Sequence, residues 1–524
     1  MTNQPTYKKL FEPCRIGRMD IRNRIVMPPM NTNYGGEDCR VTQHMKDYYE
    51  ARARGGAGLV IVEAVCVDFP EGTGVVHELN VSDDSCIAGL TELAEVIRKH
   101  GARAAIQLHH AGRDSESKIT GLQPVAPSPI PMPGGGEMPR EMSSGEIEEI
   151  VSRFARAAER VRKAGFDGVE IHGAADYLIA EFLSPAANKR ADKYGGSLEN
   201  RARLLRDVIK AVRDRVGADY PVWCRLNGME YGVEGGLTRE DCQEIARLAE
   251  RAGADAIHLG MWGIGAHQMA AAFPSVPGAL LSIAEGIKRV VTVPLVAVGR
   301  LTPEVAEQAL HEGKADLTSM GRALIADPDL PNKVEQGRAS DIVPCIACLR
   351  CGVRIRYEQK EMRCTVNPAC GREEEYRIRP AETPKRVLVV GGGPAGMEAA
   401  RVAALRGHQV TLCERSDRLG GQLHLAAIPP GKRPLIEPLA SYLAAQMENN
   451  GIAVKLNTEV DQAMLRDAAP EVVVVAAGMT PFAPQILGIA AANVVLAEDV
   501  LTGKAQVGDR VVIIGGELVG CETA

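Results

Sequence analysis

Short apolar runs alternate with longer amphipathic stretches along the first 340 residues of the chain. The eight runs are RIVMPPM (24–30), GLVIVEAV (58–65), AAIQLHHAG (104–112), DGVEIHGA (167–174), VWCRLNG (222–228), DAIHLGM (255–261), PLVAVGR (294–300) and ADLTSMGR (315–322). Apolar runs separated by helical patterns predict parallel strands that are buried on both faces. Because eight β-then-α units close a (β/α)8 TIM barrel, the pattern favours this α/β fold over a doubly wound open sheet.

The helical stretches between the runs carry end signals. The segment SSGEIEEIVSRFARAAERVRKAG (143–165) begins with Ser143, has Glu146 three residues later, and ends in glycine. This spacing predicts a helix with a capping box at its start and a glycine just past its end.

A different pattern follows the charged, proline-containing linker EYRIRPAETPKR (375–386). A predicted strand (387–390) runs into Gly391, Gly393 and Gly396, and a predicted helix follows. A second predicted strand ends at Glu414, 18 residues past the last of these glycines, and Gly421 closes a further glycine pair. Such glycines let the backbone approach a pyrophosphate, and the acid can bind a ribose hydroxyl. The segment therefore predicts a Rossmann-like site for an ADP-containing dinucleotide.

Composition and charge narrow the class of protein. The chain is 45% hydrophobic and 24% charged, as globular proteins are, and its net charge of −6 provides no basic surface for nucleic acid or anionic membranes. The N-terminus lacks the apolar stretch of a signal peptide, and no apolar run reaches the ~18 residues of a membrane span. We therefore expect a cytoplasmic protein with small-molecule partners, and the sequence leaves open whether it forms a homo-oligomer.

The carboxyl ends of the predicted barrel strands are polar. Gln107 and two histidines end the third strand, His172 ends the fourth, and Arg225 lies in the fifth. Functional groups of (β/α)8 barrels gather at this end, which makes these residues candidates for a site. The seventh and eighth strands end in the pairs Gly299–Arg300 and Gly321–Arg322. Glycine backbone N–H groups and arginine side chains can hold the phosphate of a cofactor.

Thirteen cysteines are spread along the chain, an odd number that argues against a disulfide framework. Four of them follow the spacing C-x2-C-x2-C-x12-C, namely Cys345, Cys348, Cys351 and Cys364. Four thiolates can bind zinc or iron–sulfur clusters, and three cysteines within seven residues plus a distant fourth favour a [4Fe–4S] cluster. The nearby Cys370 is expected to be a bystander.

Several segments between residues 8 and 340 resemble the old yellow enzyme family of FMN barrels. They are LFEPCRIGRMDIRNRIVMPPM, IQLHHAGR, HGAADYLIAEFLSPAANKRADKYGGSLENRARL and SMGRALIADPDLPNKVEQGR. The cysteine spacing is similar to that of the iron–sulfur branch, which includes 2,4-dienoyl-CoA reductase, 2-enoate reductase and trimethylamine dehydrogenase. The resemblance implies an electron path from NAD(P)H through FAD, the [4Fe–4S] cluster and FMN to the substrate.

The resemblance also implies which residues bind FMN. Pro28 and Gln107 would contact the flavin ring, and Arg225 would lie near its N1/O2 edge. The phosphate would be held by Gly299, Arg300, Gly321 and Arg322. Asn31 stands where trimethylamine dehydrogenases carry the cysteine that binds FMN covalently, so we expect non-covalent FMN.

His172 and Tyr177 are the candidate catalytic residues, as they are in the family. A histidine can donate a hydrogen bond to a substrate carbonyl while hydride reaches the β-carbon, and a tyrosine phenol can protonate the α-carbon. Many family members carry a second donor three residues after the histidine, where this chain has Ala175. His267, after the sixth predicted strand, is the candidate replacement, since dienoyl-CoA reductases carry a histidine in that region.

The sequence thus predicts an NAD(P)H-dependent reductase of an activated C=C bond in an unsaturated carbonyl or acyl-CoA, of the 2,4-dienoyl-CoA or 2-enoate type. One alternative is an amine dehydrogenase or N-demethylase. It is disfavoured because the chain has only two tryptophans and carries Ile355 where an aromatic side chain would help to hold a cationic amine. A second alternative is an FMN-binding fragment without a working reductase half.

The last residues, VVIIGGELVGCETA (511–524), read as the first strand and glycine turn of a second nucleotide-binding unit. We therefore expect an FMN barrel at 1–340, a cluster segment at 341–376, an FAD domain at 384–480 and the start of an incomplete NAD(P)H domain at 481–524, in a truncated chain. Glu517 occupies a position where the fingerprint has glycine, and its carboxylate would repel a pyrophosphate.

Overall fold

The computed structural model describes residues 7–263 and 276–524. The chain divides into two compact units. The first contains Met1–Ala339 and Ala347–Glu375, and the second contains Ser340–Ile346 and Tyr376–Ala524. His267, the candidate second donor, lies outside the described residues.

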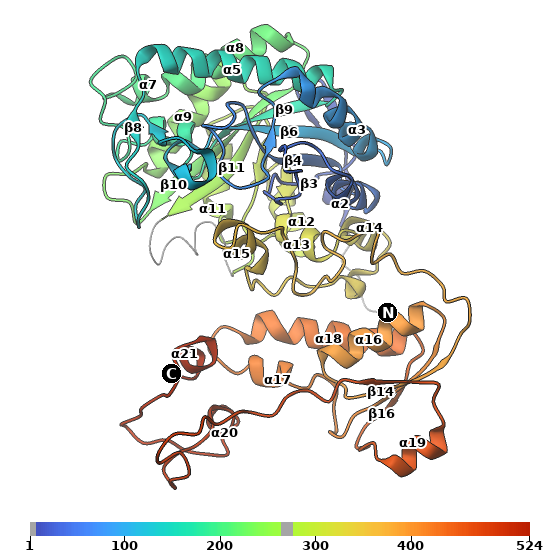
Figure 1. Ribbon diagram of the computed structural model, residues 1–524. Helices are drawn as coiled ribbons and strands as arrows, with labels where there is room; N and C mark the ends of the chain where they lie inside the picture. The colour runs from blue at the N-terminus through green and yellow to red at the C-terminus, as the bar shows by residue number, and fades with distance from the viewer. Residues whose placement is uncertain (1–6, 264–275) are drawn as a thin grey trace. The chain divides into compact units, whose positions relative to one another are not determined.

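The first unit is built on a closed barrel of eight parallel strands (Figure 1). They are β3 (Ile25–Met27), β4 (Leu59–Cys66), β6 (Arg103–His109), β9 (Gly168–Gly173), β10 (Val222–Tyr231), β11 (Ile257–Gly263), β12 (Leu295–Ala297) and β13 (Leu317–Ser319). Each strand pairs with the next, and β3 pairs with both β13 and β4, which closes the ring. The predicted (β/α)8 barrel is confirmed, and the open-sheet alternative is wrong.

Apolar side chains fill the amino-terminal end of this barrel. β1 (Cys14–Ile16) and β2 (Met19–Ile21) form an antiparallel hairpin that packs there. Its Ile16, Met19 and Ile21 share one buried cluster with residues from the starts of the barrel strands, among them Leu59, Trp223 and Leu317. The polar side chains of the strands therefore gather at the opposite, carboxyl-terminal end.

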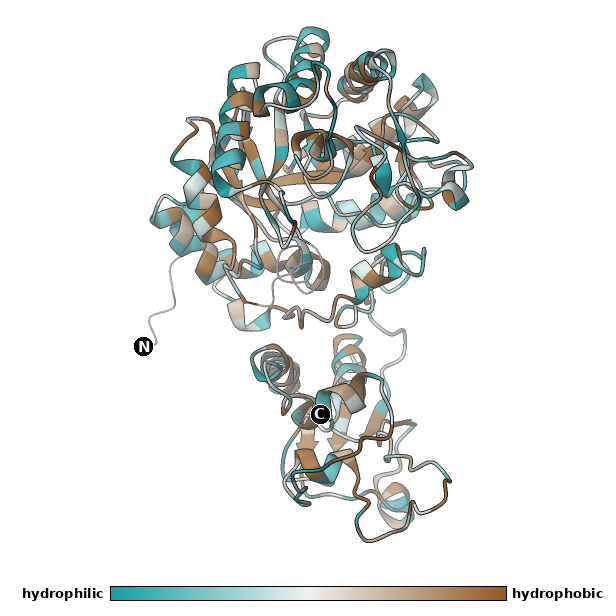
Figure 2. Cartoon of the chain, turned by 90° about the vertical axis from the view of Figure 1, so that its left-hand side faces the viewer, coloured by the Kyte–Doolittle hydropathy of each residue, from teal (hydrophilic) through white to brown (hydrophobic). Residues whose placement is uncertain are grey.

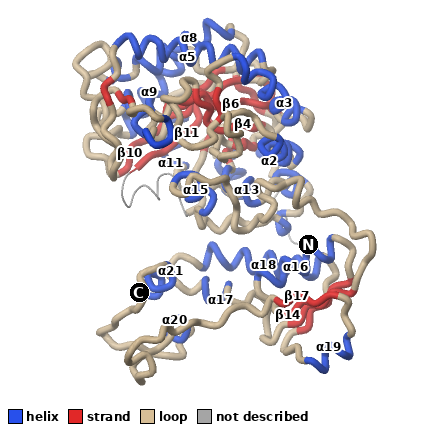
Figure 3. Tube along the Cα trace, in the orientation of Figure 1, coloured by secondary structure: helices blue, strands red, loops and turns tan. Residues whose placement is uncertain are grey.

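Helices surround the barrel, as Figure 3 shows by the blue elements outside the red strands. They include α2 (Gln43–Arg54), α3 (Ile87–Arg98), α5 (Ser144–Lys163), α8 (Arg203–Val216), α9 (Arg239–Ala252), α11 (Leu281–Lys288), α12 (Pro303–His311) and α13 (Gly321–Ala326). The barrel strands are coloured as hydrophobic in Figure 2, whereas the outer helices mix both colours. Each helix thus turns an apolar face inward and a polar face outward.

Helix α5 begins where the sequence predicts. Ser143 Oγ accepts from the backbone N–H of Glu146, and the Glu146 carboxylate accepts from the backbone N–H of Ser143 at 2.7 Å, which makes the predicted capping box. Its buried residues Ile147, Phe154 and Val161 recur at helical spacing and face the barrel.

The residues after the barrel return to its surface. Helix α15 (Arg350–Arg356) and the following loop belong to the first unit. The Tyr34 hydroxyl donates to the Met362 carbonyl at 2.9 Å, and the buried Arg52 guanidinium pairs with Glu373. These contacts fix the segment that contains Cys348, Cys351 and Cys364 to the barrel unit.

The second unit is a parallel sheet of four strands in the order β16–β15–β14–β17. These are β14 (Arg386–Val390), β15 (Gln409–Cys413), β16 (Ala453–Lys455) and β17 (Val472–Val475), with helices α16 (Pro394–Leu405) and α18 (Arg433–Asn449). The strand–helix–strand order confirms the predicted Rossmann-like region. Within the described residues, we find no helix with the length and apolarity to cross a membrane.

The end of the second unit differs from the prediction. Residues 511–514 were predicted to form a strand, but they do not pair with any described strand, and α21 (Leu518–Thr523) follows them. An apolar run becomes a strand only when a neighbour supplies its hydrogen bonds. The glycine turn does form: Gly515 has φ of +112°, close to the +109° of Gly391, and Glu517 is the residue before α21.

Candidate active site

A buried carboxylate, Glu170 of β9, is the centre of a hydrogen-bond network inside the barrel. Its Oε1 accepts from Gln107 Nε2 at 2.7 Å, and its Oε2 accepts from Trp223 Nε1 at 2.7 Å. Nδ1 of His258 lies 2.6 Å from the same Oε2. Burial raises the pKa of Glu170, but the neighbouring His258 and Arg225 outweigh burial and hold this pKa below its usual value. Glu170 therefore stays ionised and orients Gln107, a residue expected to contact the flavin.

Glu170 is not among the site residues that the sequence predicts. The available signal was an acidic residue in the middle of DGVEIHGA, a run otherwise typical of a strand buried on both faces. A charge at such a position requires partners, because an isolated buried carboxylate is costly.

Arg225 of β10 and Pro28, which follows β3, come from opposite sides of the barrel and lie at the same end of it. Arg225 is half-buried, and its Nη1 donates to the Pro29 carbonyl at 3.5 Å. A Cβ on Gly321 would lie 2.9 Å from Pro28 Cγ, so the start of α13 closely approaches the loop after β3. The structure thus brings Pro28, Gln107 and Arg225 to the carboxyl-terminal side of the barrel.

The two predicted phosphate pairs come from neighbouring strands. β12 pairs in parallel with β13, and Gly299–Arg300 and Gly321–Arg322 follow these strands. Gly299 has φ of +118°, and a Cβ there would lie 2.9 Å from Leu280 Cβ, so only glycine fits. Adjacent glycine backbones with two arginines suit an anionic group.

Two further buried polar atoms test whether FMN fits here. His258 Nε2 and Ser319 Oγ are buried and lack hydrogen-bond partners among the described residues. Buried polar atoms of this kind are rarely left unsatisfied. His258 is neutral and donates from Nδ1 to the ionised Glu170, so its Nε2 can accept from a hydroxyl. Ser319, Gln107 and Arg225 form a donor set that suits the carbonyl oxygens of a flavin mononucleotide.

Three aromatic rings meet beside this donor set. His172 ends β9, and Tyr177 precedes α6 (Leu178–Leu183). Their ring centroids are 4.8 Å apart, and the ring of His109, at the end of β6, lies 4.4 Å from Tyr177 and 5.4 Å from His172. The structure therefore brings the two predicted catalytic residues together and adds His109.

His172 is set up as a neutral donor. Burial, with the neighbouring His109 and Arg225, lowers the pKa of His172 well below its usual value, so the ring carries no charge. Its Nδ1 accepts from the Ala174 backbone N–H at 3.3 Å, which leaves the proton on Nε2. This tautomer can donate one hydrogen bond to a bound oxygen.

The loop that carries Tyr177 is held by Asn227 of β10. The Asn227 side chain accepts from the Ala175 N–H at 2.9 Å and donates to the Ala175 carbonyl at 2.8 Å. Ala175 adopts the left-handed conformation, with φ of +56°, and non-glycine residues do this at a cost of ~1 kcal/mol. The two hydrogen bonds from Asn227 offset this strain. Ala175, which stands where many family members carry a second donor, therefore helps to position Tyr177 instead.

Charged pairs surround Tyr177. Asp176 accepts from the Arg113 guanidinium at 2.7 and 3.1 Å. Asp114, which follows β6, accepts from Arg356 of α15. Burial and Asp114 raise the pKa of Tyr177, whereas Arg356 and Arg225 lower it. The phenol is therefore protonated at neutral pH and can act only as a proton donor.

A nearby set of metal-type ligands, Asp68, Glu71 and His110, does not suit a metal. Their ligand atoms lie within 4.8 Å of one another. However, His110 Nδ1 accepts from the Gly112 N–H at 3.0 Å, so its Nε2 carries the proton and offers no lone pair. Asp68 also pairs with Arg153, and Glu71 accepts from Arg140 at 2.9 Å. We interpret this group as a structural ion-pair cluster.

The cysteines differ in exposure. Cys348 is exposed, and Cys345, Cys351 and Cys364 are half-buried, whereas Cys370 is fully buried with its Sγ 3.9 Å from the Tyr34 hydroxyl. Ala347 and Leu349, on either side of Cys348, adopt left-handed conformations. Thiolates that reach the surface with this spacing suit a metal cluster, and Cys370 is expected to remain a thiol.

The second unit has the geometry of a dinucleotide fingerprint. Gly391 adopts φ of +109°, and a Cβ on Gly396 would collide with the Gly391 carbonyl oxygen. A Cβ on Gly393 would meet nothing within 4 Å, so the turn is open on that side. On the other side the backbone of Gly421 is close, because a Cβ on Gly421 would lie 2.9 Å from Gly393 Cα. The Glu414 carboxylate accepts from the Gly392 N–H at 2.6 Å. These residues suit a pyrophosphate and a ribose.

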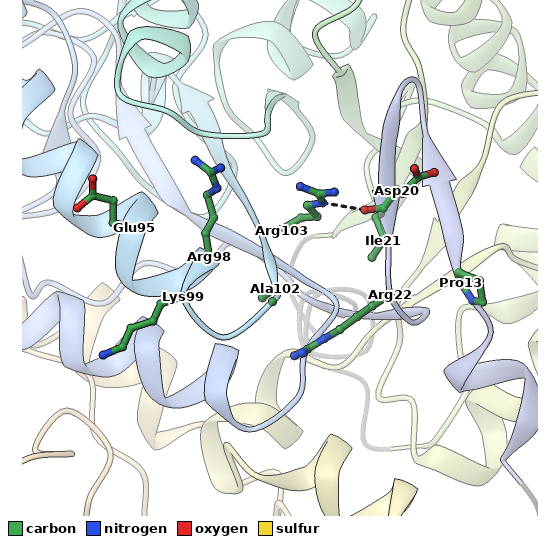
Figure 4. Close-up of a pocket in the computed structure, with 10 residues that line it drawn as sticks. Pro13, Asp20, Ile21, Arg22, Glu95, Arg98, Lys99, Ala102 and Arg103 are labelled. Carbon is green, nitrogen blue, oxygen red and sulfur yellow. Dashed lines mark hydrogen bonds between the residues drawn. The ribbon is translucent and has the colours of Figure 1, made fainter.

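A cavity of about 750 Å³ lies elsewhere, beside the hairpin of β1 and β2 (Figure 4). Arginines line it, but they brace the backbone: Arg22 donates to the carbonyls of His100 and Ala57, and Arg103 donates to the carbonyl of Asp20. It is at the starts of the strands, where (β/α)8 barrels place stabilising residues rather than active sites.

Comparisons with known proteins agree with this geometry. The NADH:flavin oxidoreductase / NADH oxidase family matches residues 9–341, and the pyridine nucleotide-disulphide oxidoreductases match residues 360–472. The chain is 46% identical over 529 residues to an NADH oxidase from Thermoanaerobacter brockii, which covers 99% of this chain and 81% of that protein. A cinnamate reductase from Clostridium sporogenes is 36% identical over 549 residues, with coverage of 99% and 81%.

A solved structure of 2-naphthoyl-CoA reductase in complex with 2-naphthoyl-CoA superimposes with a TM-score of 0.94 at 37% identity, over 99% of this chain and 81% of that chain. The first family match alone spans more than half of the sequence. The chain is therefore an oxidoreductase that belongs to the NADH:flavin oxidoreductase / NADH oxidase family, within the iron–sulfur flavoenzyme branch of the old yellow enzyme family.

Proposed function

We propose that this enzyme reduces a C=C bond conjugated to a carbonyl group. The observation that carries this proposal is the pairing of His172, a neutral N–H donor, with the protonated phenol of Tyr177, at ring centroids 4.8 Å apart. Reduction of such a bond needs a donor at the carbonyl oxygen and an acid at the α-carbon. The pair supplies both.

In the proposed reaction, His172 Nε2 donates to the substrate carbonyl and stabilises the charge that develops on its oxygen. FMN, when bound, supplies a hydride to the β-carbon. The Tyr177 hydroxyl then protonates the α-carbon. His267 remains a proposed second donor to the carbonyl. Pro28, Gln107 and Arg225 would face the flavin ring, and Gly299, Arg300, Gly321 and Arg322 would hold its phosphate.

We propose that electrons arrive from NAD(P)H through the remaining parts of the chain. Residues 384–480 would bind FAD through Gly391, Gly393, Gly396, Glu414 and Gly421, and residues 341–376 would hold a [4Fe–4S] cluster through Cys345, Cys348, Cys351 and Cys364. Bound FAD supplies a hydride acceptor, and a bound cluster supplies single-electron transfer. Residues 481–524 would contribute to the nicotinamide site, where Glu517 disfavours a close pyrophosphate.

The substrate class rests on two relatives. The cinnamate reductase and the 2-naphthoyl-CoA reductase are named for substrates that place an unsaturated system next to a carboxyl or thioester group. We propose an enoate or an unsaturated acyl-CoA, such as a 2,4-dienoyl-CoA, for this chain. The proposal agrees with the neutral donor at His172, which suits a carbonyl oxygen.

An anaerobic titration tests the proposal. The cofactor-loaded protein is titrated with NADH or NADPH, then with cinnamate, crotonyl-CoA or 2-cyclohexen-1-one, while flavin and cluster absorbance are followed separately. We expect one nicotinamide to bleach the flavin and an unsaturated carbonyl to restore it. If none of the three acceptors reoxidises the reduced protein, the proposal is wrong.

The same titration decides between the proposal and amine oxidation. Ile355 is buried, at 8% exposure, and no aromatic side chain stands at that position to hold a cationic amine. We therefore expect sarcosine and other secondary or tertiary amines to leave the oxidised flavin unchanged. Bleaching by an amine would favour the dehydrogenase instead. If NAD(P)H fails to reduce the protein but dithionite supports enone reduction, the reductase half does not work.

A further inference from the structure

His109 lies between Tyr177 and a second buried acid, Glu78. Its Nε2 is 3.7 Å from Glu78 Oε1, and its ring meets that of Tyr177 edge-on, with centroids 4.4 Å apart and planes at 86°. The exposed fraction of His109 and of Glu78 is 1% each. Neither group has a part in the hydride and proton transfers proposed above.

The backbone determines which oxygen of Glu78 faces His109. Glu78 Oε2 accepts from the N–H groups of Gly74 and Val75, at 2.7 and 3.4 Å. Glu78 Oε1 is buried and has no hydrogen-bond partner among the described residues, and the same holds for His109 Nδ1. Because two donors occupy Oε2, a proton on this carboxyl group belongs on Oε1, which faces His109 Nε2.

The protonation states of Glu78 and His109 suit proton transfer from Glu78 to His109. Burial raises the pKa of Glu78 to about 8, and burial with the neighbouring His110 lowers the pKa of His109 to about 3. At neutral pH a carboxylic acid therefore faces an uncharged imidazole. The other titratable groups that act on or are influenced by Glu78 are Cys39, Glu63, Cys66, Asp114 and Tyr177.

We propose that Glu78 and His109 form a relay that returns a proton to Tyr177 after each turnover. This inference rests on the proposed role of Tyr177 as the acid. Once Tyr177 has protonated the α-carbon, it is a half-buried phenolate that must regain a proton before the next substrate. Among the described residues, the histidine ring centred nearest that of Tyr177 is His109, at 4.4 Å, followed by His172 at 4.8 Å.

The relay balances without any redox change. The Glu78 Oε1–H bond breaks as its proton forms an N–H bond at His109 Nε2, and the His109 Nδ1–H bond breaks as its proton passes to the Tyr177 phenolate, directly or through one water. The phenol is then restored, Glu78 is a carboxylate, and His109 holds its proton on Nε2. The relay resets when His109 Nδ1 takes one proton from solvent and the Nε2–H bond breaks to return its proton to Glu78 Oε1, which restores both starting forms.

The chain offers a matched control for burial. Glu63 of β4 is as buried as Glu78, and burial raises its pKa to about 8 as well. Its carboxylate interacts with Thr32 and lies 3.5 Å from the Tyr49 hydroxyl, and no histidine faces it among the described contacts. If a buried acid alone mattered, Glu63→Gln and Glu78→Gln would behave alike.

The test compares Glu78→Gln, Glu78→Asp, Glu63→Gln and Tyr177→Phe in steady-state reduction of 2-cyclohexen-1-one, with dithionite as reductant, across pH 6 to 9. We expect Glu78→Gln to lower kcat about tenfold, to leave KM unchanged, to remove the fall in kcat near pH 8 and to change the solvent isotope effect. Glu78→Asp should recover part of the rate, and Glu63→Gln should keep the wild-type pH profile.

The first turnover separates the relay from the proposed function. In a single turnover, Tyr177 of Glu78→Gln still holds its own proton, so the rate should match that of the wild type, whereas Tyr177→Phe should be slow from the start. If Glu78→Gln keeps the wild-type kcat and pH profile while Tyr177→Phe is slow, the relay is wrong and the function stands. If Tyr177→Phe is fast, the proposed function fails with it.

Discussion

The guanidinium of Arg356 donates to the carboxylate of Asp114, with 2.6 Å between Nη1 and Oδ2, across 242 positions of sequence. Asp114 follows barrel strand β6, and Arg356 ends the helix that contains Cys351. The pair thus ties the cysteine segment to the barrel beside Tyr177. Burial raises the pKa of Asp114 to about 6 even though Arg356 opposes this rise.

Replacing Arg356 should destabilise the barrel unit in a pH-dependent way. Arg356→Gln leaves the buried carboxylate of Asp114 without its cation. The Arg356 side chain is 33% exposed, so we expect the free energy of unfolding to fall by about 2 kcal/mol, less than for a fully buried pair. The loss should grow from pH 5 to pH 8. At pH 5 Asp114 is protonated in both proteins, so the ion pair contributes little, whereas at pH 8 Asp114 is ionised in the wild type and pairs with Arg356.

Urea unfolding followed by tryptophan fluorescence measures this loss, because both tryptophans of the chain, Trp223 and Trp262, lie in barrel strands. The control is Arg15→Gln. The side chains of Arg15 and its partner Asp20 are 67% and 66% exposed, so this variant should leave the free energy of unfolding nearly unchanged. Equal effects of the two variants at pH 8 would show that the Arg356 pair is not a structural tie.

The Glu170 network makes a second prediction. Glu170→Gln removes the charge that orders Gln107, Trp223 and His258, and its amide cannot accept from all three. We expect a loss of about 2–4 kcal/mol in the free energy of unfolding and weaker retention of FMN. Unfolding at fixed FMN and the flavin released on ultrafiltration are the measurements. Glu149→Gln, on the exposed side of α5, should change neither.

The cysteines can be tested by iron content. Cys364→Ser should lose most of the iron and acid-labile sulfide, because serine does not replace a thiolate ligand in such clusters. Cys370→Ser should keep both, because that thiol is buried beside Tyr34. Inductively coupled plasma analysis of anaerobically purified protein reads out both variants. Loss of iron in Cys370→Ser with retention in Cys364→Ser would reverse the assignment.

Glu63 predicts the pH dependence of stability. Its folded pKa of about 8 exceeds the unfolded value of about 4.5, so the folded state binds more protons between these values and stability falls as pH rises through this window. Glu63→Gln removes this contribution. The Tm of Glu63→Gln minus the Tm of the wild type should therefore be a few degrees larger at pH 8 than at pH 5. Scanning calorimetry of both proteins at the two pH values measures this difference. A constant difference would mean that Glu63 is ionised in the folded state.

The barrel and the place of its site could be predicted because both depend on local patterns. Eight buried runs specify eight parallel strands, and their carboxyl ends must meet, so His172, Gln107 and Arg225 had to lie together. The Gly299 and Gly321 pairs meet for the same reason, since their strands are neighbours.

The remaining features depend on contacts that no local pattern records. Glu78 belongs to a loop before the short strand β5 (Leu79–Asn80), and only the return of that loop places it beside His109. Arg356 reaches Asp114 through the fold of the cysteine segment. Residues 511–514 have the composition of a strand, but strand formation depends on a partner elsewhere in the chain.

The most direct test of the central claim is a single turnover of dithionite-reduced protein mixed anaerobically with 2-cyclohexen-1-one, wild type against Tyr177→Phe. The account predicts that the wild type reoxidises and forms the saturated ketone, and that the variant does so at least about a hundredfold more slowly, in line with loss of a general acid. Equal rates in the two proteins, or no saturated ketone from the wild type, would contradict it.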